Sequence, residues 1–263
     1  MKELSIALLA LTSIAVFAET KRVCSPDGKM QVSVIAENGT LKYQVEYGGK
    51  EMIAPSSLGL KTDMGDYTRN LTPVKWNESK IDETYTMTRT KASKVNYVAN
   101  ALAVELKAEG CPYPMTVVLQ VSNNNIAYKY LLGGSDNNVN DEPRRATIFS
   151  ETSSFRFPDK TTTFLCPQIG GNHQGWMSTK PSYEEEYRAN APMAEKSRFG
   201  FGYTFPCLFK VGEDGWVLVS ETGVGSNYCG SHLSDYDASR GYTVAYPSHE
   251  EYHGLGSNAP AIT

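Results

Sequence analysis

The sequence MQVSVIAENGTLKYQVEY, residues 30–47, decides the fold class of the chain. Apolar and polar side chains alternate on both sides of the Asn-Gly pair at 38–39, and this period of two is typical of strands with one buried face. An Asn-Gly pair between two alternating runs is the strongest short-range signal for a hairpin turn. The stretch therefore predicts an antiparallel hairpin, and the Gly-Gly pair at 48–49 predicts a turn into a third strand at 50–53.

Short strands of the same kind are expected along most of the remaining chain. β-branched residues and the 16 tyrosines fill the apolar runs, turn residues separate nearly all of them, and no window of helical periodicity follows Ala18. About fourteen short strands separated by turns predict an all-β sandwich or a related double sheet. The strands expected beyond the opening meander are 85–89, 95–97, 102–107, 115–121, 126–131, 146–149, 155–157, 205–211, 216–221 and 242–246.

Two segments show no strand period. Residues 133–145 (GGSDNNVNDEPRR) are polar and rich in turn residues, which predicts an exposed loop between strands. Residues 170–199 form a longer segment with Trp176, Tyr183 and Tyr187, three consecutive acidic residues and two prolines. A loop of more than about 15 residues in a compact domain is usually functional or disordered. Because the aromatic side chains argue against disorder, we expect this loop to be functional.

The first eighteen residues have the features of a signal peptide. Lys2 precedes an apolar run from Leu4 to Phe17, and the segment ends in Ala18. The run is shorter than the roughly 20 apolar residues that cross a bilayer. The sequence therefore predicts cleavage after Ala18, a periplasmic or secreted protein, and no membrane segment after cleavage. Cys24 follows Lys-Arg-Val instead of small residues, so a lipid anchor on this cysteine is not expected.

Charge and length restrict the partners and the domain organisation. The formal net charge is -4, and it is unchanged when residues 1–18 are removed. Without a basic stripe, the chain is not expected to bind nucleic acid. Residues 19–263 have a suitable length for one large all-β domain. The last ten residues, GLGSNAPAIT, contain no closing strand, so we expect the polypeptide to continue into a further domain.

Cysteine and histidine spacing gives little support for a metal site built on sulfur or imidazole. Residues 249–253 read HEEYH, which matches the letters of the zinc motif H-E-x-x-H, but the preceding Pro247 and the following glycines predict a turn instead of the required helix. No nucleophile elbow, P-loop or dinucleotide fingerprint is present. Five cysteines permit at most two internal disulfides and include no CxxC pair: Cys24, Cys111, Cys166, Cys207 and Cys229.

The acidic cluster Glu184-Glu185-Glu186 is the sharpest local feature. It lies between two tyrosines in the sequence PSYEEEY, residues 181–187. Calcium prefers several carboxylate and carbonyl oxygens at about 2.3–2.6 Å, and a glutamate on an ordered loop can supply one of them. A run of charges is more often a solvated loop surface, and no EF-hand pattern accompanies this one. The residues alone therefore leave both interpretations open.

Seven segments in a fixed order resemble the N-terminal domain of glycoside hydrolase family 97. The resemblance implies a β-super-sandwich of the galactose-mutarotase-like type, with two large, mainly antiparallel sheets. It also implies a (β/α)8 barrel that follows in the same polypeptide, packs against this domain and carries the catalytic carboxylates. The segments are SPDGK (25–29), PSSLGL (55–60), ETSSFRFP (151–158), PSYEEEY (181–187), RFGFGYTFPCLF (198–209), WVLVSETGV (216–224) and NYCGSHL (227–233).

The resemblance also implies a substrate class and a metal ligand. Members of the family are exported bacterial α-glucosidases and α-galactosidases, with a calcium ion at the sugar site and one glutamate ligand supplied by the N-terminal domain. That role falls on Glu184, with Glu185 and Glu186 as alternatives because three adjacent acids blur the register. The other calcium ligands would come from the barrel, so the chain by itself is expected to be inactive. An α-linked oligosaccharide is the implied substrate.

Two other functions fit parts of the sequence. Aromatic residues make up 11% of the chain, and tyrosine and tryptophan rings stack on sugars, so a freestanding carbohydrate-binding module is the main alternative. A mutarotase-like epimerase would need a histidine acid and a glutamate base in one groove, and no histidine here matches that context. The sequence leaves open whether the parent enzyme inverts or retains configuration, which α-sugar it prefers, its oligomeric state and the disulfide pairing.

Overall fold

The chain folds as an all-β structure in which antiparallel strands form every sheet. The computed structural model describes residues 18–91, 93–133, 146–169, 185–223 and 230–246. These ranges contain 18 strands and no helix, and all of the strand pairs within them are antiparallel. The all-β sandwich expected from the alternating sequence is therefore confirmed.

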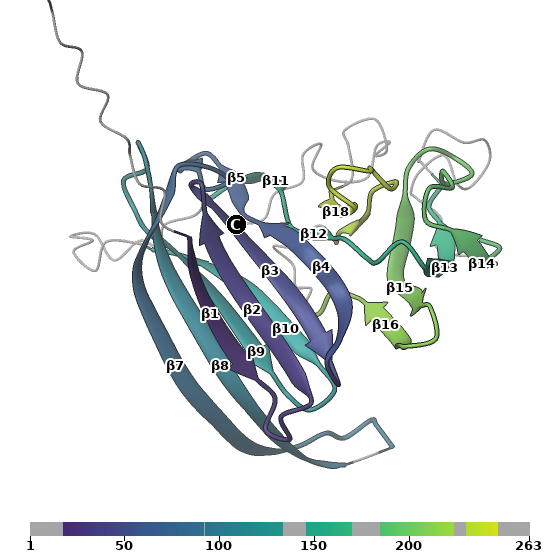
Figure 1. Ribbon diagram of the computed structural model, residues 1–263, viewed down its shortest axis with the longest axis horizontal. Coiled ribbons are helices and arrows are strands. Elements are labelled where there is room, and N and C mark those ends of the chain that lie inside the picture. The colour runs from purple at the N-terminus through teal and green to yellow at the C-terminus, as the bar shows by residue number, and fades with distance from the viewer. Residues whose placement is uncertain (1–17, 92, 134–145, 170–184, 224–229, 247–263) are drawn as a thin grey trace, which may run out of the picture.

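The strands are labelled in chain order (Figure 1). Ten of them form the first half of the chain: β1 (Glu19–Cys24), β2 (Met30–Glu37), β3 (Thr40–Tyr47), β4 (Lys50–Leu58), β5 (Leu60–Thr62), β6 (Gly65–Asp66), β7 (Leu71–Thr86), β8 (Lys94–Ala108), β9 (Met115–Val121) and β10 (Ile126–Leu132). The others are β11 (Ile148–Glu151), β12 (Ser154–Phe155), β13 (Thr161–Pro167), β14 (Arg188–Pro192), β15 (Tyr203–Val211), β16 (Gly215–Val219), β17 (His232–Leu233) and β18 (Tyr242–Ala245).

Two four-stranded sheets form the sandwich in the first half of the chain. One has the order β1-β2-β3-β4, and Figure 1 shows it lying across the second, which has the order β10-β9-β8-β7. Their inward side chains form one apolar core, which includes Val32 and Val34 from β2 and Leu102 and Val104 from β8, all 0% exposed. Burial of this apolar surface is the dominant favourable contribution to folding.

The opening hairpin forms as the sequence predicts. Residues of β2 alternate strictly between buried and half-buried, and the β2–β3 register pairs Glu37 with Thr40 across the turn. Asn38 and Gly39 have φ angles of 51° and 69°, the left-handed values that a two-residue type I′ turn needs. The third strand is longer than the predicted 50–53, because β4 continues to Leu58.

A second, smaller group of strands continues from β4. The Ala54 amide donates to the Arg156 carbonyl at 2.8 Å, and the Tyr43 hydroxyl donates to the Ser154 carbonyl at 2.9 Å, so β12 lies beside β4. From β12 the order is β18-β17-β15-β13-β14, and β16 pairs with β15. Figure 1 shows β13 to β16 to one side of the sandwich. This arrangement places the second half of the chain next to the first sheet.

Aromatic side chains fill the interior of this second group. The Phe209 ring on β15 stacks on Phe157, with ring centroids 4.1 Å apart and planes inclined by 21°. Tyr242 on β18 packs against Phe209 at 5.2 Å, and the Tyr242 hydroxyl donates to the Met193 carbonyl at 3.0 Å. Such offset aromatic pairs contribute about 0.5–1.5 kcal/mol beyond the burial of their area. The cluster therefore fixes β15 and β18 relative to each other.

Several parts of the predicted strand pattern are wrong, and β14 lies within the segment 170–199 that was expected to form a loop. The separate strands expected at 95–97 and 102–107 are one strand, β8, and the run expected at 85–89 is only the end of β7, which begins at Leu71. Most of β7 is exposed, so it lacks the apolar alternation by which a strand is recognised. β13 was also missed, because the sequence TTTFLCP has buried threonines and no regular period. Of the predicted loop 133–145, only Gly133 lies within the described ranges.

Candidate functional site

The acidic segment of PSYEEEY leads into the edge of the second sheet. β13 pairs with β15 on one side and with β14 on the other, and Glu185 and Glu186 come just before β14. Glu184, the metal ligand implied by the family resemblance, lies outside the described residues together with the rest of 170–184. The structure therefore locates the end of the acidic cluster at a sheet edge and leaves the role of Glu184 a prediction.

Two contacts attach the end of this segment to β13. The Cys166 thiol donates to the backbone carbonyl of Glu185 at 3.5 Å. The Tyr187 ring stacks on the Phe164 ring, with centroids 4.9 Å apart and planes inclined by 19°. Glu185 is half-buried and Glu186 is exposed. The backbone of Glu185 and the ring of Tyr187 are thus attached to β13, while Glu186 between them is exposed.

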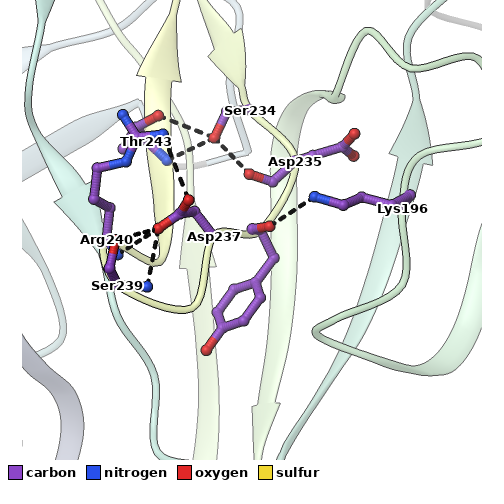
Figure 2. A network of polar contacts seen from close by, with 8 residues as sticks. Lys196, Ser234, Asp235, Asp237, Ser239, Arg240 and Thr243 are labelled. Carbon is purple, nitrogen blue, oxygen red and sulfur yellow. Dashed lines mark hydrogen bonds and ion pairs between the residues drawn. The ribbon is translucent and has the colours of Figure 1, made fainter.

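An ion pair and a polar network support the strands around this edge. Arg188 on β14 pairs with Glu195 at 2.5 Å, but the Arg188 side chain is 70% exposed, so the pair contributes at most about 1 kcal/mol. The Lys196 ammonium donates to the Tyr236 carbonyl at 3.0 Å, as Figure 2 shows. The Ser197 amide donates to the Asp235 carboxylate at 2.7 Å. These contacts join the segment after β14 to the turn between β17 and β18.

Asp237 organises that turn. Its carboxylate accepts hydrogen bonds from the backbone amides of Ser239 and Arg240 at 2.9 and 3.0 Å, and from the Ser239 hydroxyl (Figure 2). These hydrogen bonds lower the pKa of Asp237 to about 2, and the bond from the Ser239 hydroxyl has the largest effect. At neutral pH the Asp237 carboxylate is therefore ionised and accepts these hydrogen bonds.

A buried carboxyl group that the sequence did not reveal joins the two halves of the chain. The Glu151 carboxylate accepts hydrogen bonds from the hydroxyls of Tyr128 on β10 and Tyr246 after β18, at 3.3 and 3.0 Å. Burial raises the pKa of Glu151, and the negative charge of Glu221 adds to the rise, while the Ser153 hydroxyl and the two tyrosines oppose it. The carboxyl belongs to the ETSSFRFP segment, so part of that segment has a structural role.

A histidine in the NYCGSHL segment is part of the core. His232 on β17 is 5% exposed, and burial lowers its pKa to about 4, although a hydrogen bond to the Phe201 backbone partly opposes this. A histidine that is neutral, buried and hydrogen-bonded to the backbone is part of the packed core. Of the other histidines, His173, His249 and His253 lie outside the described residues, and so does the predicted HEEYH turn.

The buried imidazole predicts a loss of stability in acid. The unfolded chain binds a proton on this residue below its ordinary pKa of 6.5, whereas the folded chain does so only below about 4. Stability from this group is therefore complete above pH 6.5 and falls as the pH drops to 4, by about 3 kcal/mol. Urea unfolding between about pH 7 and pH 4 should show a steeper loss for the wild type than for His232→Gln. Parallel pH profiles of the two proteins would contradict the assignment.

The described residues fit part of a calcium site. Glu185 and Glu186 offer hard carboxylate oxygens, the donors that calcium prefers. Nowhere in the described ranges do three or more His, Cys, Asp or Glu side chains come together as a metal-binding group. Calcium takes about six to eight oxygen ligands. The described part of the chain can therefore contribute donors to such a shell, and the remaining oxygens would have to come from elsewhere.

Within the described ranges Cys24, Cys111 and Cys207 are free thiols, and the Cys166 thiol donates to the Glu185 carbonyl. Cys229 lies outside the described ranges. Burial raises the pKa of the Cys207 thiol, so this group is unreactive at neutral pH. In the part of the chain that the structure describes, no helix has the length and hydrophobicity to span a bilayer.

Comparison with known proteins identifies the family. The family model for the N-terminal region of glycosyl hydrolase 97 matches residues 23–253. A solved structure, the crystal structure of a β-arabinopyranosidase, is 47% identical to this chain, superposes with a TM-score of 0.83, and is matched over 92% of this chain and 37% of its own. A glycoside hydrolase family 97 enzyme from Pseudoalteromonas sp. strain K8, solved with panose, is 17% identical with a TM-score of 0.70, over 88% of this chain and 32% of its own.

A curated relative points to the same family. A probable retaining α-galactosidase from Streptomyces bingchenggensis is 23% identical over 210 residues, which are 79% of this chain and 28% of that protein. The chain thus spans between 28% and 37% of the length of these relatives. Because the family model covers most of the sequence and the sandwich superposes on those enzymes, the chain belongs to the N-terminal domain family of glycoside hydrolase family 97.

Proposed function

We propose that this chain is the N-terminal domain of an exported, calcium-dependent glycoside hydrolase. In this proposal it packs on the catalytic domain of the same polypeptide, shapes the sugar pocket and donates Glu184 to the metal. The observation that carries the proposal is the family match over residues 23–253, since the acidic segment within that match enters a fixed edge of the sheet. Glu185 and Glu186 remain alternative ligands.

The relatives support a substrate with the configuration of galactose. One is named a probable α-galactosidase and another a β-arabinopyranosidase. In the L form, a β-arabinopyranoside has the ring configuration of an α-D-galactopyranoside and lacks only the hydroxymethyl group. Both names therefore describe one arrangement of ring hydroxyls, and we propose glycosides of this kind as the substrate. The relative solved with panose, a glucose oligosaccharide, keeps α-glucosides as the second candidate.

The proposed metal would act together with residues of this domain. A bound calcium ion supplies positive charge that orients the sugar or a water molecule and stabilises developing negative charge. The role of this chain is to hold a carboxylate at the boundary between the two domains. The contacts of Cys166 with Glu185 and of Phe164 with Tyr187 fix the strand that enters from the acidic segment. A ligand held by a fixed strand binds with less loss of conformational entropy.

Hydrolysis assays test the proposal. The full-length polypeptide is expected to hydrolyse nitrophenyl α-galactoside or β-L-arabinopyranoside, while the 263-residue chain turns over neither. Glu184→Gln in the full-length enzyme should raise the calcium concentration for half-maximal activity about tenfold, which corresponds to about 1.4 kcal/mol. Glu213→Gln, at an ion-paired glutamate whose side chain is 92% exposed, should leave it unchanged.

Two outcomes would defeat the proposal. Robust hydrolysis by the 263-residue chain alone would show that this domain is not an accessory to a catalytic domain. An unchanged calcium requirement in Glu184→Gln, Glu185→Gln and Glu186→Gln would remove the metal role from the acidic cluster. Calorimetry of the 263-residue chain with sugars tests the alternative of a freestanding module, which predicts millimolar or tighter binding without the rest of the enzyme.

A further inference from the structure

A row of apolar side chains lies on the outward side of β13, β15 and β16, beside Lys210, which the register pairs with Trp216. The strand register pairs Phe164 with Leu208, and Leu208 with Leu218, so these side chains form a row on one face of the sheet. Trp216 lies two residues from Leu218 on the same strand and is 59% exposed, while Leu218 is 63% exposed. Tyr187 stacks on Phe164 at one end of the row. We call these five apolar residues the outer apolar face.

The outward face of β3 and the middle of β7 are polar. On β3 the outward residues are Lys42, Gln44 and Glu46, which alternate with the buried Leu41, Tyr43 and Val45. The exposed part of β7 carries the charged sequence NESKIDE, residues 77–83. Charged outward faces of this kind are suited to water. The row on β13, β15 and β16 therefore differs from these two faces, while single apolar side chains such as Phe149 and Leu131 are exposed on β11 and β10.

The outer apolar face also includes an edge strand. Among the described residues β16 pairs with β15 alone, so its other backbone edge has no strand beside it. Exposed apolar side chains on an unpaired edge favour association with another protein surface. Trp and Tyr are the residues most enriched at the centres of protein interfaces. These properties indicate that another polypeptide surface covers this face in the working protein.

The position of the face indicates which surface covers it. Tyr187 belongs to the face and follows Glu186 directly in the chain, so the end of the acidic segment lies next to one end of the apolar row. The solved relative that is 47% identical is matched over only 37% of its length, so most of that enzyme lies outside the matched domain. A segment that donates a ligand across the domain boundary must lie at that boundary, and its immediate neighbours must lie there too.

We propose that the outer apolar face is the surface on which the catalytic domain of the same polypeptide docks. The inference rests on the proposed function, because it takes the acidic segment as the point that faces the catalytic domain. Docking would bury Trp216 and Leu218 against apolar side chains of that domain and would hold the acidic segment beside the sugar site. A second copy of this chain is the competing occupant.

Hydroxyl-radical footprinting tests the docking surface. Oxidation rates of Trp216 and Tyr187 are compared between the 263-residue chain and the full-length polypeptide. Both residues should react at least about fivefold more slowly in the full-length protein. Phe149 on β11 and Tyr85 on β7 are the matched controls, since they are 57% and 45% exposed against 59% for Trp216 and 43% for Tyr187. Their rates should not change.

Three results would overturn the inference. Equal rates for Trp216 and Tyr187 in the two proteins would show that the face stays exposed. Equal protection of all four residues would show a general effect of the longer chain. Protection that increases with the concentration of the 263-residue chain, together with a dimer in light scattering, would assign the face to a second copy.

A charge substitution separates this inference from the metal role. Leu218→Asp in the full-length enzyme should lower kcat/KM at least tenfold, whereas Leu131→Asp, at a residue 47% exposed on β10, should change it less than twofold. Both residues are exposed, and circular dichroism of the two variants should match the wild type. An intact activity in Leu218→Asp would contradict docking. The calcium requirement of Glu184→Gln could be unchanged while Trp216 is still protected in the full-length protein. That result would remove the metal role of the acidic cluster and would still support the docking surface.

Discussion

Gly202→Ala is expected to lower the free energy of unfolding by about 4 kcal/mol, because two separate costs act at this position. Gly202 has a φ angle of 81°, a left-handed value that residues with a Cβ rarely adopt. An added Cβ would also overlap the Leu233 carbonyl oxygen and lie 3.2 Å from the Ser234 Cα. Backbone atoms of a paired strand cannot rotate away as a flexible side chain would.

The hydrogen bonds of Gly202 prevent an easy adjustment. Its amide donates to the Ser197 hydroxyl at 2.9 Å, and its carbonyl accepts from the Gln168 amide at 2.9 Å. A shift that relieved the overlap would weaken both bonds. Gln168 is the second to last described residue before the segment that contains Glu184, so we expect the full-length variant to lose activity together with stability.

Gly200→Ala is the matched control for this experiment. Gly200 has a φ angle of 79°, and an added Cβ there would meet nothing within 4 Å. Only the backbone cost applies, so the expected loss is about 1 kcal/mol. Equilibrium urea unfolding of the two variants and the wild type measures the difference. Equal losses in Gly200→Ala and Gly202→Ala would show that the contact with β17 has no part in the effect.

Phe209→Ala is expected to cost about 4 kcal/mol, because it removes the centre of the aromatic cluster in the second group of strands. Phe209 is 0% exposed and packs on both Phe157 and Tyr242. The cavity left by the ring would be lined by side chains from different strands, which cannot all close on it. β15 would then be held less firmly against β12 and β18.

An exposed phenylalanine provides the comparison. Phe149 is 57% exposed, and Phe149→Ala should change the free energy of unfolding by no more than about 0.5 kcal/mol. Phe209→Leu retains much of the buried volume and should fall between the two. Thermal and urea unfolding of the three variants test this order. A cost for Phe209→Ala similar to that for Phe149→Ala would mean that the cluster does not stabilise the fold.

Much of the fold could be predicted where one face of a strand is buried and the other is wet. The hairpin at 30–47 and the strand at 115–121 have that alternation, and both form as predicted. β7 could not be predicted, because its pairing with β8 extends along 16 residues that are mostly exposed on both sides. β13 could not be predicted either, because threonines occupy buried positions in this strand and a threonine counts as polar when the sequence is read alone.

The candidate site was predictable only in part. The family resemblance led to the acidic cluster, and the structure shows where the cluster ends through the contacts of Glu185 and Tyr187. The buried carboxyl of Glu151 could not be foreseen, because its partners are Tyr128 on β10 and Tyr246 after β18, which are far apart in the sequence. The outer apolar face depends on strand register, which a sequence specifies only after the pairing is known.

The backbone link between β4 and β12 has a consequence for the order of folding. The first sheet is a meander of neighbours in sequence, so its contacts close short loops and can form early. By contrast, the Arg156 amide donates a hydrogen bond to the Ser56 hydroxyl at 2.9 Å, and these two residues are 100 positions apart in the sequence. Closing so long a loop costs more entropy. The first sheet can therefore form early during synthesis and serve as a template. The later strands, including those on either side of the acidic segment, pack against it last.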